Sequence, residues 1–301
     1  MIDISGKIET LRSAIAESRV FAKKETIGRA ERGETPKGDV LTTARVAAVL
    51  AAKKTAELIP YCHPLLLDSV AVDFKIRETE IVVQTTVRSI GKTGVEMEAL
   101  TAASIAALTI YDMLKPIDKE VLIGETKLLE KKGGKSDFGE TFLSPLKSAV
   151  LVTSDSVSAG KKADRSGKII VEEMKRFPLD LRYYEIVPDD PAKIRQKLIG
   201  WVEEGIRLIV TTGGTGLGPR DLTVETVKGL IEREVPGIAE AIRSYGQRRT
   251  PYAMLSRGVV GVRGKSLFVT LPGSSRGVKE SMAAVFPNLL HIFNMMEGGG
   301  H

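Results

Sequence analysis

The chain has 301 residues, of which 43% are hydrophobic and 27% are charged. This length suggests about two domains, and the apolar content excludes a largely disordered chain because it can form real cores. The longest apolar run, residues 99–111, is shorter than the roughly 20 residues of a membrane-spanning helix, so we expect no membrane segment. The first ten residues have no apolar segment, so we expect no signal peptide. The single cysteine, Cys62, excludes an intrachain disulfide, and we expect a reducing cytoplasm.

The excess of positive over negative charge is confined to the second half of the chain. Residues 1–146 contain 21 basic and 21 acidic side chains, whereas residues 147–301 contain 23 and 17, which gives the whole net charge of +6. A basic half can bind nucleic acid or an anionic small molecule such as a nucleotide. Only 5% of the residues are aromatic, which is few for stacking bases, so we expect no nucleic-acid partner.

The first half predicts an α+β domain. Its apolar spacing indicates a helix, a hairpin of two strands, a long small-residue-rich helix and a third strand, over residues 40–58, 70–76, 81–87, 95–114 and 121–129 in that order. This order favours an open antiparallel sheet covered by helices.

The second half predicts an α/β domain. Strands are expected over residues 149–153, 181–187, 208–212 and 267–271, and helices over 166–177, 191–204, 223–233 and 277–292. Alternating strands and helices favour a mostly parallel sheet with helices on both faces, which binds ligands at the carboxyl ends of its strands. We place the domains at 1–140 and 148–301, joined by a linker at 141–147 within a Gly-, Ser- and Lys-rich stretch at 133–147.

Polar clusters interrupt the apolar pattern of the first half. In PYCHPL, two prolines hold the Cys62–His63 pair rigidly, although an ordinary turn histidine would look the same. Asp112 and Lys115 are three residues apart on one face of an otherwise apolar helix. In apolar surroundings such a pair suits proton transfer near neutral pH, but it is equally typical of a structural ion pair at a helix end. Lys37 is a candidate phosphate binder or a solvated surface lysine.

The segments PKGDV, LIPYCHPL, GKTGVEMEALTAASIAALTIYDMLK and GGKS, in this order and spacing, resemble the MoaC family of cyclic pyranopterin monophosphate synthases over roughly residues 1–140. The resemblance implies a ferredoxin-like subunit in a hexamer that converts a cyclised dihydro-GTP intermediate to cyclic pyranopterin monophosphate and pyrophosphate. Asp112 and Lys115 would be the acid/base pair, and Lys37 and His63 would hold the triphosphate. The residues that would line the pocket are Tyr61, Cys62, His63, Met97 and Glu98. Asp137 follows GGKS where the family usually has glycine.

A glycine-rich segment, GGTGLGPRD, follows a predicted strand of the second half and precedes a helix. Glycine lets backbone N–H groups approach an anion closely, but a structural turn has the same composition. Asp221 ends this segment. Its carboxylate either caps the following helix, or binds Mg²⁺ or a proton beside a bound phosphate. Asp155 and the pair Asp189–Asp190 follow two other predicted strands, so we expect these carboxylates to gather at one sheet edge.

Together, TSDSxxxG, VPDD, TTGGTGLGPRDLT and LPGSS resemble the MogA/MoaB family of molybdopterin adenylyltransferases over about residues 147–300. The resemblance implies a trimer that transfers AMP from Mg-ATP to molybdopterin. Asp189 and Asp221 would hold Mg²⁺ or activate the pterin phosphate. The residues that would bind the substrates are Asp155, Gly213, Gly214, Thr215, Gly216 and Ser274. Val224 and Ser275 stand where the family often has proline.

The two resemblances together predict a bifunctional cytoplasmic enzyme of molybdenum cofactor biosynthesis. One alternative keeps the first enzyme and makes the second half a pterin-binding scaffold without catalysis. The presence of both Asp189 and Asp221 argues against a pure binder, which would not need them. A nucleic-acid-binding second half is the other alternative, and it predicts an affinity that falls steeply with salt.

Overall fold

The protein consists of two compact units, Met1–Asp137 and Phe138–His301. The computed structural model describes residues 1–299, apart from the side chains of Lys135 and Ser136. Each unit has its own sheet and its own hydrophobic clusters. The first strand of the second unit, β5 (Leu146–Thr153), begins inside the segment that we assigned to the linker. The exact domain limits therefore stay a prediction.

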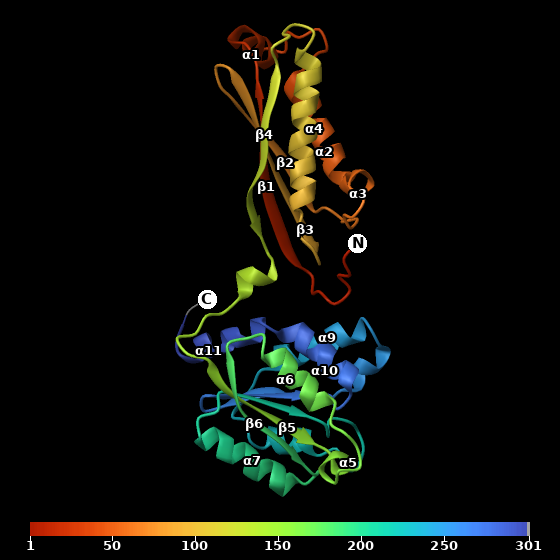
Figure 1. Ribbon diagram of the computed structural model, residues 1–301, viewed down its shortest axis with the longest axis vertical. Coiled ribbons are helices and arrows are strands. Elements are labelled where there is room, and N and C mark those ends of the chain that lie inside the picture. The colour runs from red at the N-terminus through yellow and green to blue at the C-terminus, as the bar shows by residue number, and fades with distance from the viewer. Residues whose placement is uncertain (300–301) are drawn as a thin grey trace. The chain divides into compact units, whose positions relative to one another are not determined.

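The first unit has a four-stranded antiparallel sheet in the order β2-β3-β1-β4 (Figure 1). Its strands are β1 (Thr10–Phe21), β2 (Ser69–Ile76), β3 (Glu80–Gly91) and β4 (Leu122–Lys132). Its helices are α1 (Lys24–Glu31), α2 (Val40–Lys53), α3 (Thr55–Leu58) and α4 (Glu96–Leu114), and a short turn of 3-10 helix, η1 (Lys135–Phe138), follows the last strand. Helices α2 and α4 lie side by side on one face of the sheet. The expected antiparallel sheet covered by helices is confirmed.

Strand β1 was missing from our sequence prediction, although it lies in the middle of the sheet between β3 and β4. Its buried face is built largely from small residues, including Ala14, Ala16 and Ser18, so the apolar alternation is weak. The predicted helix over 40–58 is in fact two helices, because the chain leaves the helical conformation at Lys54.

Helix α4 packs closely on the sheet through alanines. Ala99 and Ala103 belong to one buried cluster with Ala14 and Ala16 of β1, where the absence of longer side chains lets the helix approach the strands. By length and composition alone, α4 is long and apolar enough to cross a membrane, contrary to our estimate from the apolar run. Half of its most apolar window is buried inside the protein, and its contacts with α2 and β1 are those of a core helix.

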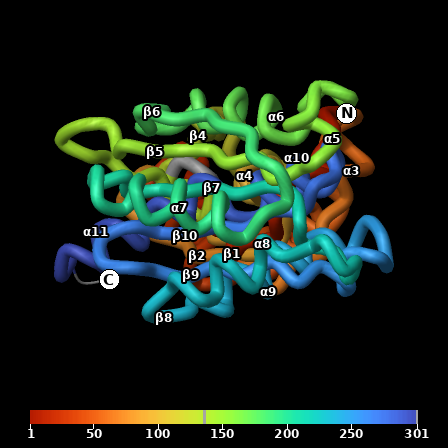
Figure 2. Tube along the Cα trace, turned by 90° about the horizontal axis from the view of Figure 1, so that it is seen from below, coloured from red at the N-terminus to blue at the C-terminus, as the bar shows by residue number. Residues whose placement is uncertain are grey.

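The second unit has a six-stranded sheet in the order β6-β5-β7-β10-β9-β8, which Figure 2 shows from top to bottom. Besides β5, its strands are β6 (Leu179–Val187), β7 (Leu208–Thr212), β8 (Arg233–Glu234), β9 (Val260–Arg263) and β10 (Ser266–Leu271). Strands β6, β5, β7 and β10 run parallel, and β9 and β8 complete one edge in antiparallel pairings. The prediction of a mostly parallel sheet is confirmed.

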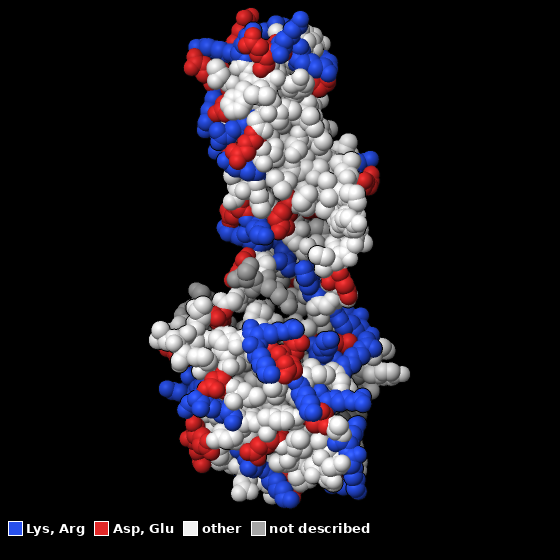
Figure 3. Space-filling view, viewed as in Figure 1, with Lys and Arg blue, Asp and Glu red and all other residues white. Residues whose placement is uncertain are grey.

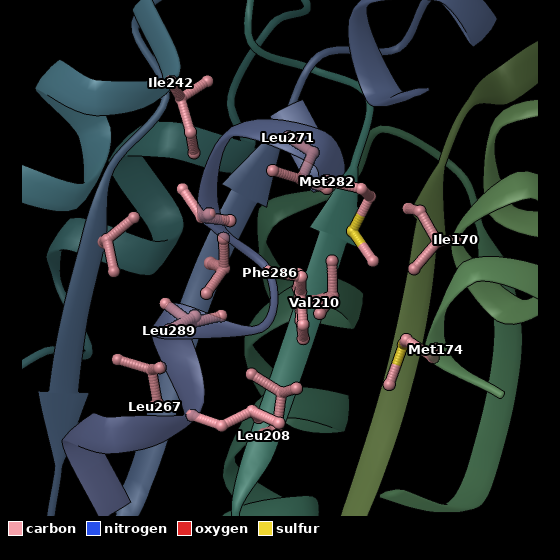
Figure 4. Close-up of a cluster of buried hydrophobic side chains, with 14 of the residues drawn as sticks. Ile170, Met174, Leu208, Val210, Ile242, Leu267, Leu271, Met282, Phe286 and Leu289 are labelled. Carbon is pink, nitrogen blue, oxygen red and sulfur yellow. The ribbon is translucent and has the colours of Figure 1, made fainter. Parts of the chain in front are cut away.

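Helices cover both faces of this sheet, as expected. One face carries α6 (Ser166–Met174), α9 (Pro236–Gln247) and α10 (Ser275–Val285), and the other carries α7 (Pro191–Glu203) and α8 (Thr223–Lys228). Figure 4 shows the first face, where Met282 packs against Val210 and Ile170 in the largest core cluster. The remaining elements are α5 (Asp155–Ser158), η2 (Pro251–Leu255), η3 (Asn288–Leu290) and α11 (His291–Met296).

Several predicted limits in this unit were wrong. Helix α8 ends at Lys228, and Arg233, which we placed in it, begins β8. The predicted helix over 277–292 is interrupted after Val285, where Pro287 lacks the N–H group that a continuing helix needs. Helix α9 and the strands β8 and β9 were missed.

Candidate active sites

One cluster of charged side chains gathers at the carboxyl end of α4. Asp112 lies in the last turn, and Lys115 follows as the C-terminal cap. Lys115 Nζ lies 2.8 Å from Asp112 Oδ1. Lys37, from the loop before α2, donates to Asp112 Oδ2 at 2.6 Å and to the Asp112 backbone carbonyl at 3.1 Å. One carboxylate therefore lies between two ammonium groups, which leaves a net positive charge at this end of the helix.

The protonation states in this cluster differ from our expectation. Hydrogen bonds from Lys115 and Lys37 lower the pKa of Asp112 to about 2, and the bond to Asp112 raises the pKa of Lys115. The side chains of Asp112 and Lys115 are 51% and 53% exposed. Their surroundings are therefore not apolar, contrary to our expectation. In the free chain, neither group is poised for proton transfer near neutral pH.

The other candidate residues of the first unit lie at the amino end of α4. Glu98 is only 4% exposed, and its burial raises the pKa of its carboxyl group. Cys62 is half-buried, and burial followed by the nearby charge of Glu98 raises the pKa of its thiol. Met97 is partly exposed and Tyr61 is largely exposed. His63 is half-buried and lies in the loop that leads to β2.

A single chain does not bring these two groups together. Glu98 and Asp112 are separated by almost four helical turns, which corresponds to about 21 Å along the axis of α4. The Lys37–Asp112–Lys115 cluster and the Cys62–Glu98 group therefore form two half-sites at opposite ends of one helix. The side chains of Lys135 and Ser136, from the GGKS segment, lie outside the described part of the structure.

In the second unit, the predicted residues come together at the carboxyl ends of the parallel strands. Asp155 follows β5 and Asp189 follows β6, and each carboxylate accepts the backbone N–H of the other residue, at 3.1 and 3.0 Å. Asp190 has a separate role, because its side chain caps α7 by accepting the N–H groups of Ala192 and Lys193. The local pattern could not distinguish these two neighbouring aspartates, whereas the resemblance to the MogA/MoaB family selected Asp189.

The glycine-rich loop after β7 approaches its neighbours too closely for side chains. Gly213 and Gly214 have φ angles of 100° and 60°, in the region that favours glycine. A β-carbon at Gly213 would lie 2.1 Å from the carbonyl oxygen of Thr153, and one at Gly214 would lie 2.2 Å from Thr223 Oγ1. This loop also lies against the loop after β10, since a β-carbon at Gly273 would be 3.3 Å from Gly213 Cα.

Asp221 is not a helix cap. Its Oδ2 accepts the N–H of Gly218 at 2.8 Å within the glycine-rich loop, and the residue before α8 is Leu222. Ser274 does cap a helix, because its hydroxyl oxygen accepts the N–H of Gly277 at the start of α10 at 3.1 Å. Thr215, the third residue of this loop, is buried, at 7% exposure.

The carboxylates of this site interact electrostatically. Burial raises the pKa of Asp189, and the charges of Asp155 and Asp221 raise it further, against the opposing effects of the Asp155 N–H and of Arg220. Arg220, in the loop after β7, pairs with Asp155 Oδ2. The site thus gathers three carboxylates and one guanidinium beside the glycine-rich loop.

Comparison with known proteins relates the two units to two protein families. The MoaC family matches residues 1–134, and the probable molybdopterin binding domain matches residues 149–291. The molybdenum cofactor biosynthesis bifunctional protein of Chlorobaculum tepidum is 44% identical over 301 residues, which cover 100% of this chain and 96% of that protein. The chain belongs to the family of bifunctional molybdenum cofactor biosynthesis proteins.

Two further relatives each match one half of this bifunctional protein. The cyclic pyranopterin monophosphate synthase of Roseiflexus sp. (strain RS-1) is 54% identical over 138 residues, which cover 45% of this chain and 87% of that protein. The crystal structure of the molybdopterin biosynthesis enzyme MoaB from Thermus thermophilus is 45% identical, with a TM-score of 0.49, and covers 51% of this chain and 97% of its own. The two family matches and the full-length relative confirm the resemblance of both halves to proteins of molybdenum cofactor biosynthesis.

The sequence did not reveal every residue that shapes the second site of this bifunctional protein. Arg257, which lies between η2 and β9, donates from Nε to the carbonyl of Gly216 and from Nη2 to the carbonyl of Asp221, both at 2.7 Å. Arg220 stood inside the quoted motif without an assigned role. The spacing of the residues around these two arginines does not indicate what either side chain contacts. Their partners are seen only in the folded chain.

Proposed function

We propose that the first unit converts the cyclised dihydro-GTP intermediate to cyclic pyranopterin monophosphate and pyrophosphate. The Lys37–Asp112–Lys115 cluster carries this proposal, because two ammonium groups held on one carboxylate form a preorganised site for a polyphosphate. The strand order, with helices after β1 and β3, supports a ferredoxin-like classification of this unit.

In this proposal, the substrate changes the state of the cluster. Its phosphates compete with Asp112 for the ammonium of Lys37, and the covered site excludes water, which lowers the cost of taking a proton from Lys115. Asp112 and Lys115 then act as the acid/base pair. Lys37 and His63 hold the phosphate that closes into the cyclic ester as pyrophosphate leaves, while Tyr61, Cys62, Met97 and Glu98 line the pterin pocket.

We further propose that two copies of the chain complete this site. The two half-sites lie about 21 Å apart along α4, so one substrate cannot touch both within one copy. A second copy that packs in the opposite direction along α4 would place its Cys62–Glu98 end beside the Lys37–Asp112–Lys115 end of the first. Exposed apolar side chains on the helical layer, Val46 and Leu50 of α2 and Leu108 of α4, support self-association, and a hexamer is the proposed state.

The test supplies the purified full chain with the cyclised intermediate and measures cyclic pyranopterin monophosphate and pyrophosphate together. Lys115→Ala should lower the rate at least about 100-fold, because it removes a proton-transfer group. Asp221→Ala, in the second unit, is the matched control and should leave this rate unchanged. Full activity of Lys115→Ala would refute the assigned role.

We propose that the second unit transfers AMP from ATP to molybdopterin. An oxygen of the molybdopterin phosphate attacks the α-phosphorus of ATP, and the bond from that phosphorus to the β-phosphate oxygen breaks, so pyrophosphate leaves. The observation that carries this proposal is the convergence of Asp155, Asp189 and Asp221 on a glycine-rich loop at the strand ends.

The residues of this site fit Mg²⁺. Among the described residues, no group of three or more His, Cys, Asp or Glu side chains is arranged to hold a metal ion. Mg²⁺ commonly takes only one or two carboxylates and completes its shell with phosphates and water. Asp189 and Asp221 each use Oδ2 for a backbone N–H, and we propose Oδ1 of each as a ligand. Bound there, Mg²⁺ would neutralise charge on the transferring phosphates.

The chain's own groups would orient the reactants. The backbone N–H groups of Gly213, Gly214 and Gly216 would bind phosphate oxygens, since glycine has no side chain to hold an anion away from its N–H. The hydroxyl of Ser274 accepts from Gly277 and keeps its own proton to donate to a phosphate. Asp155 holds Asp189 through their paired backbone contacts and would contact the substrate at the edge of the site.

A scaffold without catalysis is the second candidate, since the matching family is described only as a probable molybdopterin binding domain. Pyrophosphate release by the purified chain with molybdopterin and Mg-ATP decides between the two. Release that requires molybdopterin and disappears in Asp221→Ala establishes the transferase. Molybdopterin binding without release, in a preparation that still makes cyclic pyranopterin monophosphate, establishes the scaffold.

We propose the cytoplasm as the location, which the single cysteine supports. We propose small anionic substrates, and neither nucleic acid nor a membrane, as partners. On the face that Figure 3 shows, blue Lys and Arg side chains of the second unit alternate with red acidic ones, unlike the continuous basic stripe of a nucleic-acid surface. Filter binding of a DNA duplex at low salt would overturn this part of the proposal.

A further inference from the structure

The position of the Asp221 carboxylate depends on the conformation of its own loop. Oδ2 accepts the Gly218 N–H at 2.8 Å, and β-carbons at Gly216 and Gly218 would lie 2.7 and 2.8 Å from the same oxygen. The carboxylate thus packs directly on the loop backbone. Because glycines have few conformational restrictions, this loop needs contacts from elsewhere to keep one shape.

Arg257 supplies such contacts from a distant part of the chain. Its Nε donates to the carbonyl of Gly216, 41 residues earlier, and its Nη2 donates to the carbonyl of Asp221, 36 residues earlier, both at 2.7 Å. Its backbone N–H also reaches the carbonyl of Thr215 at 3.4 Å. One guanidinium therefore joins the two ends of the loop that carries the carboxylate.

The guanidinium is itself held in place. Its Nη1 pairs with Glu225 of α8, and the Arg257 side chain is 29% exposed. Three nitrogens of a rigid planar group thus bind three acceptors in fixed directions. Lysine has a single point charge on a flexible chain and cannot bridge the same three acceptors.

We propose that Arg257 is a positioning residue that holds the Gly216–Asp221 loop closed and thereby fixes the carboxylate of Asp221. Its contacts go to backbone carbonyls and to Glu225, so it acts through the loop. The consequence for catalysis rests on the proposed AMP transfer, whereas the consequence for the loop does not.

The first test measures amide hydrogen exchange of the full chain without substrate. Arg257→Gln should speed exchange across residues 214–221 by about 10-fold or more, because the loop opens more often. Arg207→Gln is the matched control, since Arg207 also binds a backbone carbonyl, that of Lys265 at 3.0 Å, and a glutamate, Glu297 at 2.9 Å, but lies before β7. It should leave exchange of residues 214–221 unchanged. Unchanged exchange in Arg257→Gln would overturn the proposal.

The second test measures AMP transfer. Arg257→Gln should lower kcat by about 10- to 100-fold, as expected for a displaced catalytic carboxylate, with a smaller change in KM for Mg-ATP. Arg257→Lys should be intermediate. In an Asp221→Asn background, Arg257→Gln should change the remaining rate by less than about 2-fold, because both changes disable the same group. Fully multiplicative effects would overturn the proposal.

The two tests separate this inference from the proposed function. If the wild-type chain transfers no AMP, the proposed reaction fails, and hydrogen exchange alone decides whether Arg257 positions the loop. If the wild type is active and the exchange of Arg257→Gln is normal, the reaction stands and the role of Arg257 falls.

Discussion

Asp112 keeps its negative charge in unusually acidic solution because two ammonium groups bind its carboxylate oxygens. Its folded pKa of about 2 lies below the ordinary value of 3.8, so its contribution to stability is complete above pH 4 and disappears as the pH falls toward 2. We predict that the carboxyl carbon of Asp112 titrates near pH 2 by NMR. Lys115→Ala should move that midpoint upward, and Lys131→Ala, whose partner is Glu96, should not. A wild-type midpoint near 4 would contradict the geometry.

Asp189 shows the opposite behaviour. Burial and its acidic neighbours raise the pKa of its carboxyl group, so the folded state disfavours the charged form and loses stability as the pH rises through that pKa. We predict that Asp189→Asn raises the melting temperature at pH 7 by about 2 °C, more than at pH 4, while lowering AMP transfer at least 10-fold.

The control for Asp189→Asn is Asp180→Asn on β6, which breaks the pair with Arg182 and should not raise the melting temperature. A lower melting temperature for Asp189→Asn at pH 7 would show that its contact with the Asp155 N–H outweighs the charge repulsion.

At the scale of elements, the glycine-rich loop depends on close backbone approach as well as on its φ angles. Gly213→Ala should destabilise the second unit by about 2–4 kcal/mol and abolish AMP transfer, since its β-carbon would meet the Thr153 carbonyl at 2.1 Å. Gly205→Ala is the matched control, because Gly205 also has a positive φ, 77°, but has nothing within 4 Å of a β-carbon. Thermal denaturation compares them, and equal losses would mean that φ alone matters.

The success of the sequence analysis followed the strength of each element's local signal. Helices α4 and α7 have strong local signals and were placed within a residue or two at each end. Strand β1 was missed because Ala14, Ala16 and Ser18 give little apolar contrast, although α4 needs such small residues to approach the sheet. Where the helix packs most closely on the sheet, the small side chains of the strand therefore remove the apolar alternation that would predict it from the sequence.

The candidate sites were predictable where their residues are close in sequence. The glycine-rich segment and the aspartates that follow the strands could be identified as candidate site residues directly from the sequence. The contact between Lys37 and Asp112 spans 75 residues, and the contacts of Arg257 span 36 and 41. Such contacts form only when the tertiary fold brings separate elements together. The local periodicity of the sequence therefore does not predict them.

At the scale of the whole molecule, the segment before β5 belongs physically to the second unit. Glu140 Oε1 lies within hydrogen-bond distance of His291 Nδ1, at 2.6 Å, and the Phe142 and Phe293 rings meet edge to face at 6.5 Å. We predict that fragments 1–137 and 138–301 fold separately and keep their respective activities. Fragment 148–301, cut at our sequence-based boundary, should melt at least about 3 °C lower than 138–301, because it loses these contacts and the start of β5. Equal melting temperatures would contradict this assignment.

The presence of both units on one polypeptide has a consequence for flux. Two separate enzymes can be made in any proportion, so a cell can adjust two steps independently through gene expression. Here the numbers of the two kinds of active centre are locked at one to one in every molecule. The balance between the two steps can then be set only by the turnover and affinity of each centre, and a change in gene dosage scales both steps together.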